Sequence, residues 1–162
     1  DTAGGSYSVL GYGSSLGHGQ KDNGEYDTTQ EIDYASATAF MANRKCILNL
    51  GVYDEWFVSH YEDVDLSLRA RRRGGKCFRA GSSVMYHKGA VTYKKYAVKE
   101  ITIYNIRKNR IRVIVKNYTG IVKLMRLSLV TATHIPLMIY DMISPARTNR
   151  LLTIQATWEG LT

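Results

Sequence analysis

Hydrophobic and polar residues follow four successive patterns along this chain of 162 residues. Residues 1–30 are glycine-rich and lack a regular apolar spacing, which is typical of loops and turns. An apolar face with helical spacing begins at Tyr61, and two short β-like runs follow it at 76–80 and 83–86. A long, mainly apolar segment covers 119–143. The order of these patterns predicts an α/β domain followed by a helical tail.

A short helix is expected before Tyr61. The small apolar residues of 34–42 favour a buried strand or a tight turn. Asn43 is a good N-cap residue and Gly51 is typical of a helix end, so the residues between them, 44–50, should be helical.

The second predicted helix carries several acids near its start. Ser59 and Glu62 have the spacing of a capping box, which gives Glu62 a structural role. Asp63 has no such role, because it lies on the side of the helix away from the apolar face. Asp65 can pair with Arg69 one turn later. Asp63 is therefore the free acid of this helix.

The end of this helix and the tail behind it follow simpler rules. Three arginines and two glycines at 71–75 predict the helix C-terminus. Polar residues interrupt the segment 119–143, so it falls short of the roughly 18 to 20 apolar residues of a spanning helix. Pro136 should kink or end it. Two interpretations remain open, an amphipathic helix at a membrane interface and a helix packed under the preceding domain.

Positive charge is concentrated in the second half of the chain. The net charge is +8, and residues 88–150 contain thirteen Lys or Arg against Glu100 and Asp141. Such a surface favours phosphate groups on anionic lipid, a lipid diphosphate or nucleic acid, or it is only a solvated face. No helix-turn-helix, zinc-finger or RNA-binding signature occurs, and we do not expect a nucleic-acid partner.

Length, glycines and cysteines exclude several classes. At this length the chain buries one core and not two full-size domains, and we expect it to be part of a longer protein. The glycine-rich stretch 11–19 lacks the strand and the Gly-Lys-Ser/Thr of a phosphate loop. Cys46 and Cys77 have no metal-binding spacing and make no disulfide framework, which fits a reducing, cytosolic setting.

The strongest chemical signal is the acid pair Glu62-Asp63. The helix N-terminus favours ionised carboxylates there, and an ionised carboxylate can act as a base. His87 follows Asp63 at the end of a predicted strand. Alone, a histidine in such a place is more often a hydrogen-bonded scaffold residue than a metal ligand.

Six segments together resemble the acceptor half of family 2 glycosyltransferases, in order and in approximate spacing. They are residues 37–44, 51–57, 61–69, 74–76, 86–89 and 107–110. The branch they resemble most is that of the rhamnosyl- and galactofuranosyltransferase-like enzymes of the GT-A fold. The resemblance covers residues 1–118, and its most specific part is Glu62-Asp63-Val64-Asp65-Leu66 followed by Tyr86-His87.

The resemblance implies a fold and a set of roles. Residues 1–118 would form the acceptor-side, C-terminal half of a GT-A domain, a mixed sheet with flanking helices, and 119–162 a basic helical tail. Asp63, with Glu62 beside it, would be the general base that takes the proton of the acceptor hydroxyl. His87 would join the family's Asp-x-Asp carboxylates in holding Mg²⁺ or Mn²⁺ on the donor diphosphate.

The resemblance further implies that substrate contacts come from Ala37, Trp56, Asp65 and Arg69. Two features depart from the family pattern. Ala37 stands where the family has glycine beside the donor sugar. The donor-binding half with its Asp-x-Asp does not occur in the sequence, since Asp63-Val64-Asp65 lies in a predicted helix and not after a strand. We therefore expect this chain alone to be inactive.

These expectations describe part of an inverting glycosyltransferase that moves a sugar from a nucleotide-sugar donor to a glycan or lipid-linked acceptor. The expected location is cytoplasmic, and peripheral attachment to the inner face of the cell membrane is left open. The alternative is a non-catalytic basic module that binds anionic membrane or nucleic acid, in which the carboxylates only cap a helix.

Overall fold

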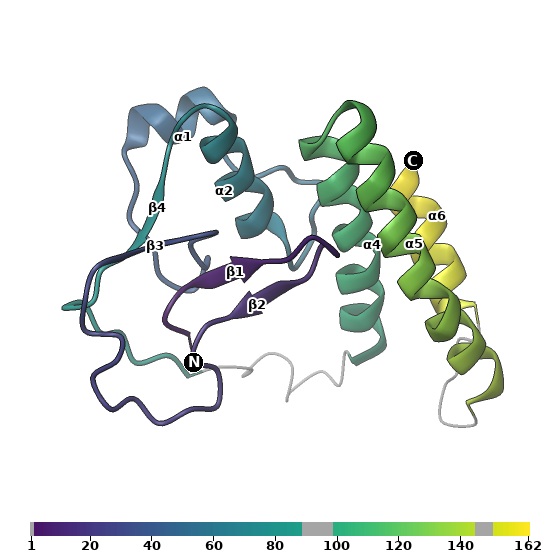
Figure 1. Cartoon of the computed structure of the whole chain (residues 1–162), viewed down its shortest axis with the longest axis horizontal. Coiled ribbons are helices and arrows are strands. Elements are labelled where there is room, and N and C mark those ends of the chain that lie inside the picture. The colour runs from purple at the N-terminus through teal and green to yellow at the C-terminus, as the bar shows by residue number, and fades with distance from the viewer. Residues whose placement is uncertain (1, 89–98, 145–150) are drawn as a thin grey trace. The chain divides into compact units, whose positions relative to one another are not determined.

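A computed structural model describes residues 2–88, 99–144 and 151–162. This part of the chain is a mixed α/β structure with five helices and two small antiparallel sheets (Figure 1). It divides into two compact units. The first unit contains residues 2–8, 13–56 and 62–88, and the second contains 9–12, 57–61, 99–144 and 151–162. The predicted combination of helices and strands is confirmed.

The first unit holds both sheets, and each sheet is a pair of three-residue strands. β1 (Gly5–Tyr7) pairs with β2 (Gly13–Ser15), and β3 (Gln30–Ile32) pairs with β4 (Cys77–Arg79). Gly5 also forms a bridge with Tyr34. A Cβ atom at Gly5 would lie 2.3 Å from the Tyr34 ring, so only glycine fits there.

Two strand expectations are wrong. The glycine-rich N-terminal stretch was expected to hold only loops and turns, yet it forms β1 and β2. The run 76–80 does contain β4, but its partner is β3, and residues 83–86 form no strand. Ile32 is buried opposite Cys77 in the β3–β4 pair. Burial of this apolar side chain favours a long-range pairing over a local hairpin.

Helix α1 (Arg44–Leu50) forms as predicted. The Asn43 Oδ1 atom accepts the Cys46 N–H at 3.2 Å, and Gly51 ends the helix in the left-handed region at φ +85°. Before α1, the tight turn is confirmed, because the Ala39 N–H donates to the Ser36 carbonyl. A buried strand is wrong for this segment, since residues 37–42 are exposed.

Helix α2 (Glu62–Arg72) ends as predicted but begins differently. At its end, Gly74 has φ +80° and its N–H donates to the Arg71 carbonyl. At its start, the expected capping box between Ser59 and Glu62 is wrong. His60 and Tyr61 have φ +67° and +70°, so the helix cannot extend back to Ser59.

The second unit contains helices α4 (Lys99–Asn117), α5 (Gly120–Ile143) and α6 (Leu152–Leu161). Ile111, Ile114 and Val130 form its apolar core. In Figure 1, α5 and α6 run in opposite directions beside α4, which agrees with their side-chain contacts. α6 packs closely on α4, since a Cβ atom at Gly160 would lie 2.7 Å from the Lys108 carbonyl oxygen.

The sequence predicted that Pro136 would kink or end this helix. It does not end α5, because the helix continues to Ile143. Side-chain contacts on both sides of the proline hold the helix together. His134 contacts Thr157 of α6 at 2.7 Å, and Asp141 accepts the Thr153 N–H at 3.1 Å. These contacts attach α5 to α6 on both sides of the proline.

The segment Arg107-Lys108-Asn109-Arg110 has structural contacts inside the second unit. Arg107 forms an ion pair with Asp141 at 2.6 Å, and the Thr153 hydroxyl contacts both side chains. The Asn109 Nδ2 atom donates to the carbonyls of Ser59 and His60 at 2.8 and 2.7 Å. These bonds hold the two residues with positive φ that precede α2.

Candidate active site at the start of helix α2

The candidate site lies in the first unit, where α2 begins. Glu62 and Asp63 occupy the first turn of the helix, where its N–H groups and dipole favour negative charge. The turn at 36–39 and the loop from Tyr53 to Trp56 supply the remaining groups. All of these groups belong to the same compact unit.

Asp63 is held in one orientation by two backbone N–H groups. Its Oδ2 atom accepts the Ala37 N–H at 3.1 Å, and its Oδ1 atom accepts the Val64 N–H at 2.8 Å. The side chain remains half-buried. The structure therefore brings together Asp63 and Ala37, two residues that the sequence placed in one site from positions 26 apart.

Glu62 stands beside Asp63 in a different environment. Its Oε2 atom is buried and has no hydrogen-bond partner among the described residues. Burial raises the pKa of Glu62, its own backbone N–H opposes that rise, and the Asp63 charge adds to it. Glu62 therefore does not act as the expected capping residue. It is a carboxyl group whose charged form is disfavoured in the folded chain.

Tyr53 is a residue of the candidate site that the sequence analysis included only within the segment 51–57. Burial raises the pKa of the Tyr53 phenol, and the charges of Asp63 and Glu62 raise it further. The phenol therefore remains protonated and can donate a hydrogen bond near the two acids. Its place in an acidic and aromatic loop was the only signal available in the sequence.

Asp65 and Arg69 form the pair that the sequence predicted. The Arg69 Nε atom lies 2.8 Å from Asp65 Oδ2, and Asp65 is fully buried. Arg69 also donates to the carbonyls of Leu50 and Val52, the latter at 2.6 Å. The pair thus ties the end of α1 to α2 and fixes the beginning of the loop that carries Tyr53.

Trp56 and His87 occupy different positions relative to this site. The Trp56 N–H donates to Asp54 Oδ1 at 2.9 Å, and its side chain is half-buried at the end of the loop. His87 is exposed in a segment without regular structure. No group of three His, Cys, Asp or Glu side chains that could hold a metal ion occurs within residues 2–88, 99–144 and 151–162. The expected metal role of His87 stays a prediction, because a single imidazole does not make a metal site by itself.

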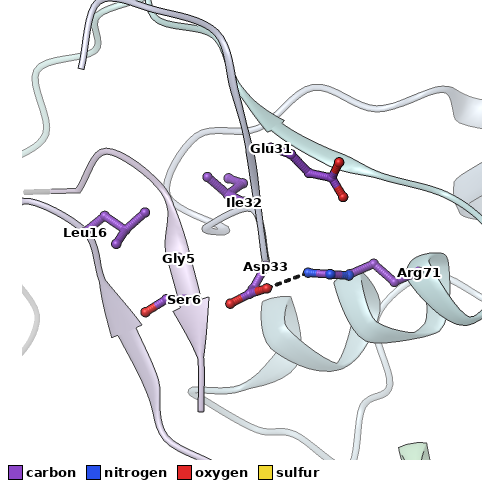
Figure 2. A pocket seen from close by; sticks show the side chains of 7 residues that line it. All are labelled: Gly5, Ser6, Leu16, Glu31, Ile32, Asp33 and Arg71. Atoms are coloured by element: carbon purple, nitrogen blue, oxygen red, sulfur yellow. Dashed lines mark hydrogen bonds and ion pairs between the residues drawn. The ribbon is translucent and has the colours of Figure 1, made fainter. Parts of the chain in front are cut away.

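A shallow pocket of the first unit lies at the other end of α2. Figure 2 shows Arg71 reaching Asp33 across it, with an Nη1 to Oδ1 distance of 2.7 Å. Asp33 also accepts the Tyr7 N–H, so the ion pair fixes β1. Eight residues of helix, about 12 Å, separate Arg71 from Asp63. Because Arg71 and Asp33 bond to each other and to β1, we assign a structural role to this pocket.

Comparisons with known proteins found no match for this chain. No family model matches the chain, and no curated protein or solved structure is significantly similar to it.

The raised pKa of Glu62 predicts that the free energy of unfolding differs between the wild type and a Glu62→Gln variant, and that this difference depends on pH. The folded chain binds the Glu62 proton more tightly than the unfolded chain does, so this group lowers stability as pH rises above its ordinary value of 4.5. Glu62→Gln removes the charge, and we expect the variant to be more stable than the wild type at pH 7. The gain should disappear as the pH falls below 4.5.

Urea unfolding at several pH values measures this difference. The two tryptophans lie in different units, so a Trp158→Phe background leaves Trp56 to report on the first unit. Glu55→Gln is the matched control, because it makes the same chemical change at an exposed glutamate of the same unit. Equal stability of Glu62→Gln and wild type at pH 7 would contradict the assigned environment of Glu62.

Proposed function

We propose that this chain is the acceptor-side part of an inverting glycosyltransferase with a GT-A-like domain. The observation that carries the proposal is the hydrogen bond between Asp63 and the Ala37 N–H, which joins the acid pair to the exposed turn at 36–39. The sugar comes from a nucleotide-sugar donor, and the acceptor is a glycan or lipid-linked hydroxyl. The glycosyltransferase-like order of motifs in the sequence supports this class.

Asp63 acts as the general base in this proposal. A hydroxyl is a weak nucleophile until a base removes its proton. As the acceptor oxygen bonds to the anomeric carbon, its proton passes to Asp63, and the bond from that carbon to the donor phosphate oxygen breaks. The leaving diphosphate takes the electron pair. Attack from the face opposite the diphosphate inverts the anomeric centre.

Glu62 and Tyr53 support Asp63 in this scheme. The phenol of Tyr53 lies near the acid pair and can donate a hydrogen bond to an acceptor oxygen. Burial raises the pKa of Glu62, so a negative charge on Glu62 beside Asp63 is disfavoured. Trp56 borders the acceptor through the loop that Arg69 and Asp65 hold in place.

A divalent cation, Mg²⁺ or Mn²⁺, would neutralise the diphosphate charge, and His87 is its proposed ligand from this chain. In this proposal a donor-binding segment supplies the further carboxylates of the site, as the glycosyltransferase resemblance implies. The full-length natural protein that contains this chain is therefore the right material for an activity assay.

The test is sugar transfer by that full-length protein from a panel of nucleotide sugars to glycan and lipid-linked acceptors. We expect one donor to support transfer, and His87→Ala should raise the Mg²⁺ or Mn²⁺ concentration needed for half-maximal rate about 10-fold or more. His18→Ala is the matched control, an exposed histidine that should leave the metal requirement unchanged.

Two results would count against the proposal. An unchanged metal requirement in His87→Ala removes His87 from the metal site. Absence of transfer with every donor, together with salt-dependent binding of the chain to nucleic acid, would favour the alternative of a non-catalytic basic module.

A further inference from the structure

Helix α5 of the second unit exposes an almost entirely apolar face. Among its exposed side chains, only Ser128 and the phenol of Tyr140 are polar. A soluble surface rarely carries so continuous an apolar patch unless something covers it. The large apolar side chains of this outward face are Ile121, Val122, Leu124, Met125, Leu129, Ile135, Ile139, Met142 and Ile143.

The inward side of α5 has the opposite character. Its buried residues are Val130, His134 and Asp141, two of which are polar. His134 contacts the Thr157 hydroxyl, and Asp141 pairs with Arg107. Proteins in water bury apolar side chains and expose polar ones, whereas helices in lipid place their polar groups toward other helices. α5 has the second distribution.

The polar residues that interrupt this apolar segment in the sequence are held within the second unit. His134 and Asp141 are buried against α6, and the two threonines bond to their own helix. The Thr131 hydroxyl donates to the Leu127 carbonyl, and the Thr133 hydroxyl donates to the Val130 carbonyl, both at 2.7 Å. Hydroxyls bonded to their own helix in this way need no water. The interruptions therefore do not exclude contact with hydrocarbon.

The length of α5 fits a bilayer. Its 24 residues extend about 36 Å, and the hydrocarbon core of a bilayer is about 30 Å thick. Only 11% of its most apolar 18-residue window is buried within the chain. The sequence had suggested too few apolar residues for a spanning helix, but α5 is long and apolar enough to cross a membrane.

The charged groups at the beginning of α5 suit an anionic lipid surface. Lys123 and Arg126 lie in its first two turns, and no acid lies between Gly120 and Tyr140. Basic residues at a helix end attract the phosphates of anionic lipids, while the aliphatic part of each side chain can lie along hydrocarbon. The positive charges at the beginning of α5 and its apolar outward face therefore both favour an anionic lipid bilayer as the partner.

We propose that the outward face of α5 is embedded in the hydrocarbon of an anionic phospholipid bilayer, with Lys123 and Arg126 at the headgroups. Helices α4 and α6 cover its polar side. The proposal concerns the second unit alone and does not depend on the glycosyltransferase activity.

Single-cysteine labelling of the whole chain tests the proposal. Cys46→Ser and Cys77→Ser remove the native thiols, both of which are free. Ile135→Cys and Ile139→Cys then carry an environment-sensitive nitrobenzoxadiazole label on the outward face of α5. Leu48→Cys is the matched control, because Leu48 is a similarly exposed apolar residue on helix α1.

The labelled proteins are mixed with vesicles of phosphatidylcholine and phosphatidylglycerol, some of which carry a doxyl quencher on the acyl chain. We expect the labels at 135 and 139 to shift to shorter emission wavelengths and to be quenched, and the label at 48 to do neither. Loss of quenching at both α5 positions would overturn the proposal. So would a detergent-free dimer whose label at 135 is shielded without vesicles, because a second copy would then cover the face.

Discussion

Asp63→Asn should lower the rate of sugar transfer about 100-fold to 10,000-fold in the full-length protein, with little change in acceptor KM. Asparagine is similar in size to aspartate and can still accept the Ala37 N–H that Asp63 accepts now. It cannot take the proton of an acceptor hydroxyl. The substitution therefore removes the proposed chemistry and keeps the hydrogen bond from Ala37, although the bond from the Val64 N–H to Oδ1 is lost.

Steady-state kinetics with saturating donor measure this effect, and Asp33→Asn serves as the control. Asp33 is half-exposed and bonds to Arg71 at the other end of α2, so its loss should leave the transfer rate unchanged. Glu62→Gln should reduce the rate less than Asp63→Asn does. An intact rate in Asp63→Asn, with a large loss in Glu62→Gln, would move the role of base to Glu62.

Arg107→Met should lower the free energy of unfolding of the second unit by about 3–5 kcal/mol. Arg107 is the ion-pair partner of Asp141, which is fully buried, and the Thr153 hydroxyl contacts both side chains. Methionine fills similar volume but leaves the Asp141 charge without its cation. The loss is large because a buried charge without its counterion is far less stable than a buried pair.

Urea unfolding in a mild detergent measures this loss, with Trp158 as the probe in a Trp56→Phe background. The double variant Arg107→Met/Asp141→Leu should recover most of the stability, because both charges are then gone. Lys76→Met is the control for an exposed pair, and because Lys76 lies in the first unit its effect is read from Trp56 in a Trp158→Phe background. Its ion pair with Glu31 is open to solvent, and its loss should change stability by about 0–1 kcal/mol. A similarly small effect of Arg107→Met would show that the buried Asp141 side chain does not need Arg107 as its ion-pair partner for stability.

The sequence alone predicted the structure correctly where that structure depends on residues close together in the chain. Asn43 and Gly51 bound α1 as expected, and Gly74 ends α2, because helix ends are set by a few local hydrogen bonds. The start of α2 depends on Asn109, about fifty residues away, which holds the carbonyls of Ser59 and His60. Capping rules do not include such a contact, and for that reason the capping box was predicted in error.

The candidate site shows the same difference between local contacts, which could be predicted, and long-range contacts, which could not. The pairing of Asp65 with Arg69 follows from their helical spacing and could be predicted. The hydrogen bond from Ala37 to Asp63 joins residues 26 positions apart, and only the family resemblance suggested that they belong together. The buried environment of Glu62 and the proximity of Tyr53 depend on the path of the loop, which residue spacing does not define.

Arg69 holds the loop that leads to Tyr53 through the main-chain carbonyls of Leu50 and Val52, without any contact that requires their side chains. Any amino acid other than one that distorts the backbone can supply the same two oxygens. Natural variants can therefore exchange side chains along residues 52–56 while the anchor remains. In the glycosyltransferase that we propose, single substitutions in this loop would then change acceptor selectivity in descendants that keep the same scaffold.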